Sequence, residues 1–102
     1  MKYPLDPKDV TTRRITATTL ICEGPCLLVS LLVSPITTGG YATAHNGVNA
    51  SAPAVVDVIA PNTISEGYNP PVPIYLSQGL HVVFTTLAGS VTVQFVKLQQ
   101  TE

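Results

Sequence analysis

The feature that most constrains this chain is an alternation of apolar and polar residues that Pro and Gly repeatedly interrupt. Thr and Val, both β-branched, fill much of the sequence between the interruptions. Such residues favour strands, and no long window has apolar residues at helical spacing. Turn signals recur about every 8–12 residues, which is typical of sandwiches and barrels. The sequence therefore predicts an all-β protein, an antiparallel β-sandwich of jelly-roll-like type with about six to eight strands.

The alternation predicts seven strand segments. They are residues 14–22, 26–34, 41–45, 54–60, 74–76, 79–87 and 90–98. The last two flank a short Ala88-Gly89 turn, and both alternate cleanly between apolar and polar faces. We therefore expect them to form a β-hairpin. Residues 62–73, rich in Asn, Gly and Pro, are predicted to form a loop.

The segment 26–34 (CLLVSLLVS) is apolar on both faces apart from Ser30. A strand of this kind is central and covered on both sides. In so small a sandwich, the second cover is expected to come from another subunit. The residues predicted to line this oligomer interface are Leu28, Leu32, Val83 and Val96.

Charged residues are few and are concentrated near the N-terminus. They make up 11% of the chain, against roughly a quarter in average proteins. Between residues 15 and 94 the only charges are Glu23, Asp57 and Glu66. The formal net charge of −1 excludes a polybasic nucleic-acid binder and an acidic disordered chain. Either neighbouring subunits cover much of this surface, which we favour, or Thr hydroxyls alone keep it hydrated.

Residues 1–12 are predicted to form an extended arm, followed by a sandwich domain over residues 13–102. Pro4 and Pro7 exclude a helix or a central strand there. The arm is either a frayed terminus or a segment that reaches onto a partner. In the second case Tyr3 and Leu5 would be apolar anchors. The basic residues that would pair with an acidic surface are Lys2, Lys8, Arg13 and Arg14.

No residue pattern predicts catalysis, a cofactor or a metal. Cys22 and Cys26 are either two small apolar residues flanking a tight turn or partners in a bond across it. His45 and His81 are not at zinc-finger spacing. His81 is expected to be partly exposed or at an interface, and Asp57 to face solvent or pair across an interface. An enzyme is therefore not expected.

The sequence predicts neither a secretory signal nor a membrane span. The N-terminus lacks an apolar core segment. The most apolar stretch, residues 26–36, is far shorter than the ~20 residues a spanning helix needs. We expect a soluble protein made in a cytoplasm.

Three stretches resemble small β-sandwich virion proteins of tailed bacteriophages. They are residues 15–28 (ITATTLICEGPCLL), 79–84 (GLHVVF) and 88–93 (AGSVTV). The resemblance implies a head decoration (cement) protein on the capsid surface of the virion. Such proteins typically form trimers and bind neighbouring subunits of the major capsid protein.

A second hypothesis is a carbohydrate- or receptor-binding β module of a phage tail or fibre base. Tyr41, Tyr68 and Tyr75 would then form the platform on which a sugar stacks.

Overall fold

The computed structural model describes residues 9–61 and 64–98, in which nine β-strands and no α-helix form. The all-β class predicted from the sequence is confirmed. The strands are β1 (Thr11–Ile15), β2 (Thr19–Glu23), β3 (Cys26–Thr38), β4 (Gly40–His45), β5 (Ala54–Ala60), β6 (Glu66–Tyr68), β7 (Ile74–Leu76), β8 (Gly79–Thr85) and β9 (Ala88–Lys97).

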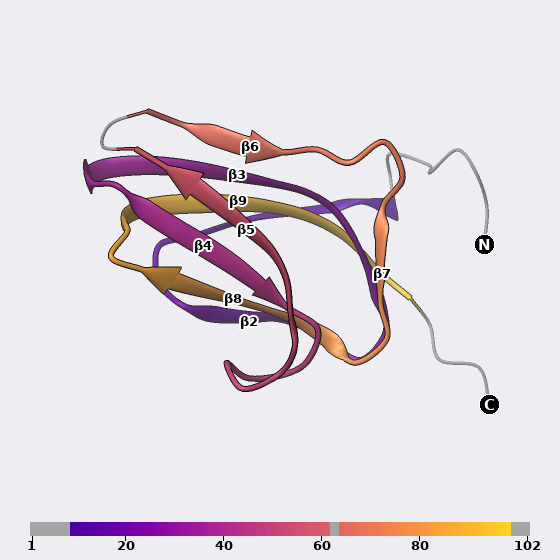
Figure 1. Ribbon diagram of the computed structural model, residues 1–102. Helices are drawn as coiled ribbons and strands as arrows, with labels where there is room; N and C mark the ends of the chain where they lie inside the picture. Colours follow the sequence, from indigo (N-terminus) through magenta and orange to yellow (C-terminus); the bar gives the residue numbers. More distant parts are fainter. Residues whose placement is uncertain (1–8, 62–63, 99–102) are drawn as a thin grey trace.

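The strands form two antiparallel sheets that pack together as a sandwich (Figure 1). The first sheet has the order β1-β9-β3-β6, with β7 also paired to β3, and the second has the order β2-β8-β4-β5. The pairing is nested: β1 pairs with β9, β2 with β8, β3 with β6 and β7, and β4 with β5. From β1 and β9 to β4 and β5, the paired strands lie progressively closer together in the sequence.

The predicted hairpin between the last two strands is wrong, although both strands exist. β8 lies in the second sheet between β2 and β4, whereas β9 lies in the first sheet between β1 and β3. The chain turns between the sheets at Thr86, whose φ is 56°. Leu80 and Val82 from β8 and Val91 from β9 are all fully buried in one core. A hairpin and a corner between sheets both bury one face of each strand, so alternation alone does not distinguish them.

The predicted first strand, 14–22, is two strands in different sheets. β1 pairs with β9, and β2 pairs with β8 after the bend at residues 16–18. Ile15 and Ile21 enter the same core from opposite sides. The Phe84 amide donates a hydrogen bond to the Thr18 hydroxyl (3.0 Å), which fixes the bend against β8. β1 begins at Thr11, so the last residues of the predicted arm belong to this sheet.

β3 is a central strand, as predicted, with β9 on one side and β7 and then β6 on the other. A register shift between Leu28 and Ser30 interrupts its pairing with β9. A bulge of this kind adds one residue and reverses which side chains face inward. Consequently Leu28 and Leu31, three residues apart, both lie in the core.

The remaining predicted strands, 41–45, 54–60 and 74–76, correspond to β4, β5 and β7. Residues 66–68, which were expected to lie in a loop, form the short strand β6. The Tyr68 side chain on β6 packs against the core. This contact stabilises the pairing of β6 with β3.

Candidate interaction surface

Several large apolar side chains are exposed where β3, β4, β5 and the segment before β6 meet. Ile36, Ile59 and Ile64 are 62%, 70% and 53% exposed, and Tyr41 is 38% exposed. Tyr41 and Ile59 are direct cross-strand partners. The Ile64 amide donates to the Pro61 carbonyl (3.1 Å), which holds the following segment close to β5. We call this group of four residues the isoleucine end.

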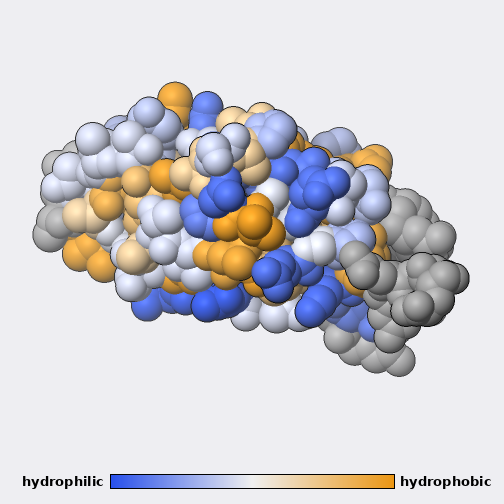
Figure 2. All heavy atoms as spheres, turned by 90° about the horizontal axis from the view of Figure 1, so that it is seen from below, coloured by the Kyte–Doolittle hydropathy of each residue, from blue (hydrophilic) through white to orange (hydrophobic). Residues whose placement is uncertain are grey.

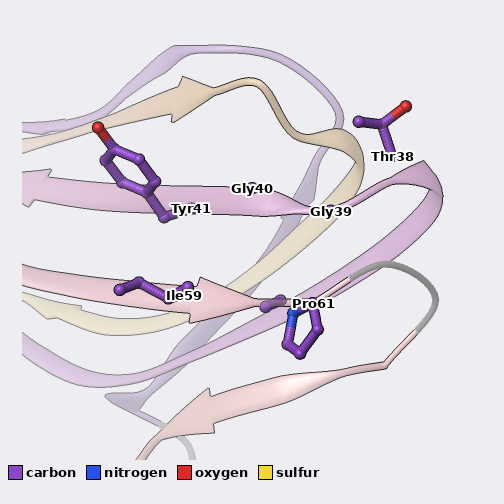
Figure 3. A pocket seen from close by; sticks show the side chains of 7 residues that line it. Thr38, Gly39, Gly40, Tyr41, Ile59 and Pro61 are labelled. Atoms are coloured by element: carbon purple, nitrogen blue, oxygen red, sulfur yellow. The ribbon is translucent and has the colours of Figure 1, made fainter.

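An open hollow of about 540 Å³ lies beside this group. In Figure 3, Tyr41 and Ile59 extend from neighbouring strands, and Pro61 follows at the end of β5. None of the lining residues is charged. They are Thr38, Gly39, Gly40, Tyr41, Ile59, Ala60 and Pro61. A hollow of this composition would contact an apolar or aromatic group through dispersion and would form few hydrogen bonds.

Figure 2, which views the molecule from below, shows hydrophobic residues in separate patches with hydrophilic residues between them. Single exposed apolar residues are normal on a soluble protein, whereas a group of them marks a contact surface. The isoleucine end is therefore the strongest contact candidate among the described residues.

The four residues predicted to line an oligomer interface do not form one surface. Leu28 is fully buried in the chain's own core, and Val96 is 8% exposed. Leu32 is 44% exposed and, like Val96, does not belong to the core between the sheets. Val83 is half-buried on β8 in the second sheet. The bulge after Leu28 puts Leu28 and Leu32 on opposite faces of β3.

The predicted partner-binding residues fall into two groups. Lys2, Tyr3, Leu5 and Lys8 lie outside the described residues. Arg13 and Arg14 are exposed residues of β1, an edge strand of the first sheet, where they are paired with Val93 and Thr92. Their charges are therefore carried by a sheet edge.

The second sheet brings the two histidines together, which the sequence did not predict. His45 and His81 are cross-strand partners with ring centroids 6.4 Å apart. His45 Nδ1 is 2.8 Å from the Ala52 carbonyl oxygen, whereas His81 Nδ1 is buried without a hydrogen-bond partner. Desolvation, followed by the charge of His45, lowers the pKa of His81. The register between β4 and β8 creates this pair, and strand alternation carries no signal of that register.

Asp57 and His45 have different hydrogen-bond partners. Asp57 accepts a hydrogen bond from the Thr43 hydroxyl (2.6 Å), its cross-strand partner. The histidine pair lies on a different row of the sheet, opposite Ala54. No group of three His, Cys, Asp or Glu side chains placed to hold a metal ion occurs among the described residues.

The three tyrosines of the carbohydrate hypothesis are also separated. Tyr41 is on β4 in the second sheet, and Tyr75 is on β7 in the first. Tyr68 is half-buried against the core. The prediction that the three tyrosine rings form a single platform is therefore wrong.

Comparison with known protein families, with characterised proteins and with solved structures finds no match. In the part of the chain that the structure describes, no helix is long and apolar enough to cross a membrane.

Proposed function

We propose that this protein is a head decoration (cement) protein of a tailed bacteriophage. It binds the assembled capsid lattice as an oligomer, with a trimer favoured, and it contacts the major capsid protein. The proposal rests on the sequence resemblance at residues 15–28, 79–84 and 88–93 together with the features of the fold that follow.

The strand pairing supports a jelly roll. A jelly roll has eight strands in two sheets, and it occurs in viral capsid proteins and in lectins. Here the outermost strands pair first (β1 with β9), then β2 with β8, and the innermost pair is β4 with β5. The short strands β6 and β7 both pair with β3, and together they take the position of one strand of the eight-stranded jelly roll.

The observation that carries an interaction role is the isoleucine end. Three isoleucines have more than half of their surface in water, and one of them, Ile59, lines a hollow without charge. Burying apolar surface contributes about 25 cal/mol per Å². Covering these side chains with a coat subunit would therefore favour the bound state, as a cement protein requires.

Linked copies would strengthen weak individual contacts. Once one copy of an oligomer is bound, the other copies experience an effective concentration of roughly millimolar at their own sites. Each isoleucine end then needs only a modest affinity. The arm, residues 1–12, is proposed as a second point of attachment on each copy.

The isoleucine end can be tested with a double substitution, Ile36→Ser plus Ile59→Ser. We expect capsid occupancy in co-sedimentation with purified shells to fall at least about tenfold, since each tenfold corresponds to ~1.4 kcal/mol. The matched control is Val72→Ser, which changes a residue that is 60% exposed outside this group. Equal occupancy for all three proteins would contradict the proposal.

The arm needs a separate deletion. Because β1 begins at Thr11, the deletion should remove residues 1–8 and leave this strand intact. We expect a folded oligomer, measured by light scattering, that binds shells less well than the full chain. A full chain that stays monomeric at all concentrations and does not bind shells would contradict the decoration role itself.

One observation favours the second candidate, a carbohydrate- or receptor-binding module of a tail or fibre base. Tyr41 borders the hollow together with the Thr38 hydroxyl and the Gly39-Gly40 backbone. An aromatic ring beside polar groups can stack against a sugar and hold its hydroxyls. Glycan-array binding that disappears in Tyr41→Ala, without any binding to shells, would favour this function.

A further inference from the structure

The turn between β2 and β3 holds two cysteines that belong to different sheets. Cys22 lies in β2 of the second sheet, and Cys26 is the first residue of β3 in the first sheet. Both are free thiols, and both are part of the core cluster. Only Glu23, Gly24 and Pro25 separate them. A covalent bond at this point would join the two layers directly.

The backbone holds this turn from two sides. The Gly24 amide donates to the Gln78 carbonyl (3.2 Å), and the Leu98 amide donates to the Pro25 carbonyl (3.1 Å). Gly24 has a φ of 86°, in the left-handed region that glycine adopts without steric cost. The fold thus fixes the chain on both sides of the thiols, and we call this region the thiol corner.

The two thiols influence each other. Burial, and after it the neighbouring Cys22, together raise the pKa of Cys26 to about 12. The Cys22 sulfur lies over the turn that leads to Cys26, 3.8 Å from the Glu23 carbonyl oxygen and 4.0 Å from the Gly24 carbonyl oxygen. No third metal-ligating side chain joins them within residues 9–61 and 64–98.

We propose that Cys22 and Cys26 form an intramolecular disulfide that cross-links the two sheets when the protein meets a small oxidised disulfide such as oxidised glutathione. The bond makes the thiol corner a redox-dependent cross-link, open in a reducing cytoplasm and closed outside it. It does not depend on the proposed capsid role.

The reaction proceeds by thiol–disulfide exchange. The Cys22 thiolate attacks one sulfur of glutathione disulfide, which breaks the S–S bond and releases one glutathione thiolate. The Cys26 thiolate then attacks the Cys22 sulfur of the mixed disulfide and releases the second glutathione. Two protons and two electrons pass in total from the cysteine pair to the oxidant, which leaves as two reduced glutathiones.

The order of attack follows from the surroundings of each thiol. Cys22 is 5% exposed, whereas Cys26 is fully buried. Only the thiolate is nucleophilic, and the raised pKa keeps Cys26 protonated near neutral pH. Cys22 therefore attacks the glutathione disulfide first, and Cys26 closes the bond.

The test compares the native chain with the same chain in urea across glutathione buffers of increasing oxidation. Samples are quenched in acid, unfolded and alkylated, and the remaining thiols are counted by intact mass. We expect the native chain to form a monomeric disulfide, two hydrogens lighter, at a level of oxidised glutathione at least about tenfold lower than the urea-unfolded chain needs. Closure that needs as much oxidant in the native state as in urea would overturn the proposal.

Two variants make the assignment specific. Cys22→Ala and Cys26→Ala each keep one thiol. Cys26→Ala should stop at a mixed disulfide with glutathione, whereas the buried Cys26 of Cys22→Ala should remain a free thiol. A monomeric species without a free thiol or a bound glutathione in either variant would overturn the assignment. Disulfide-linked dimers of the native wild-type chain in place of the monomeric product would overturn it as well.

Discussion

The isoleucine end and the thiol corner lie at opposite ends of β3, and they treat their apolar side chains differently. At the thiol corner Cys22, Cys26 and Leu76 are almost completely buried, and backbone hydrogen bonds hold the turn. At the isoleucine end Ile36 and Ile59 are mostly exposed. The sandwich therefore encloses large apolar side chains at the thiol corner, where backbone hydrogen bonds hold the turn, and leaves them in water at the isoleucine end. The difference indicates that the thiol corner stabilises the fold, whereas the isoleucine end is available for contacts with a partner.

The largest effect should come from a cavity at the thiol corner. Leu76 is fully buried and pairs with Cys26, so Leu76→Ala should destabilise the protein by ~2–5 kcal/mol. Urea unfolding measures this loss. Tyr75→Ala, in the same strand but 58% exposed, should have a much smaller effect.

At the isoleucine end, by contrast, the loss of an apolar side chain should hardly change the stability of the fold. Ile59→Ser should change the free energy of unfolding by only about 0.5 kcal/mol, because its side chain is already in water. A loss similar to that of Leu76→Ala would mean that Ile59 contributes to the core, and the two regions would no longer differ.

A loss smaller than that of Leu76→Ala is expected at Gly40, where the isoleucine end meets the corner between β8 and β9. A Cβ at this position would overlap the Thr85 carbonyl oxygen and lie 2.6 Å from the Leu87 amide nitrogen. Gly40→Ala should therefore cost about 1–3 kcal/mol through forced backbone shifts. The measurement is the midpoint of thermal or urea unfolding.

Gly67→Ala is the matched control, because a Cβ there would meet its nearest neighbours at 3.5 Å, an ordinary contact. It should change stability by less than ~1 kcal/mol. Equal losses for the two variants would show that the close approach at Gly40 does not hold the corner in place.

The sequence predicted strands better than it predicted their partners. The inward positions of Val82, Val91 and Phe95 follow from alternation, and all three lie in the core. The corner at Thr86 and the bend at residues 16–18 were missed, because a change of sheet leaves the alternation intact. Strands with one buried face show the same alternation whether consecutive strands pair in a hairpin or lie in opposite sheets of a sandwich.

The candidate site was harder to predict for the same reason. Ile36, Ile59 and Ile64 come from separate segments, and only Ile59 falls within a predicted strand. Their exposure depends on where β3 and β5 end and on the bulges that set which side faces inward. The His45–His81 pair likewise depends on the register of β4 against β8. Such long-range pairing is decided by packing, which a local pattern does not encode.

The smallest effect should come from the histidine pair, which lies on the second sheet near the thiol corner. The pKa of His81 in the folded protein is lowered, first by desolvation and then by the charge of His45. Below the ordinary histidine pKa of about 6.5, the unfolded chain therefore binds a proton that the folded chain resists. The stability associated with His81 is complete above this pH and is lost as the pH falls through it towards the lowered pKa.

Urea midpoints between about pH 8 and pH 5 measure this dependence. His81→Gln should flatten the curve, whereas His45→Gln removes only the second cause and should leave a weaker slope. A slope that His81→Gln does not change would place the pH sensitivity in other groups.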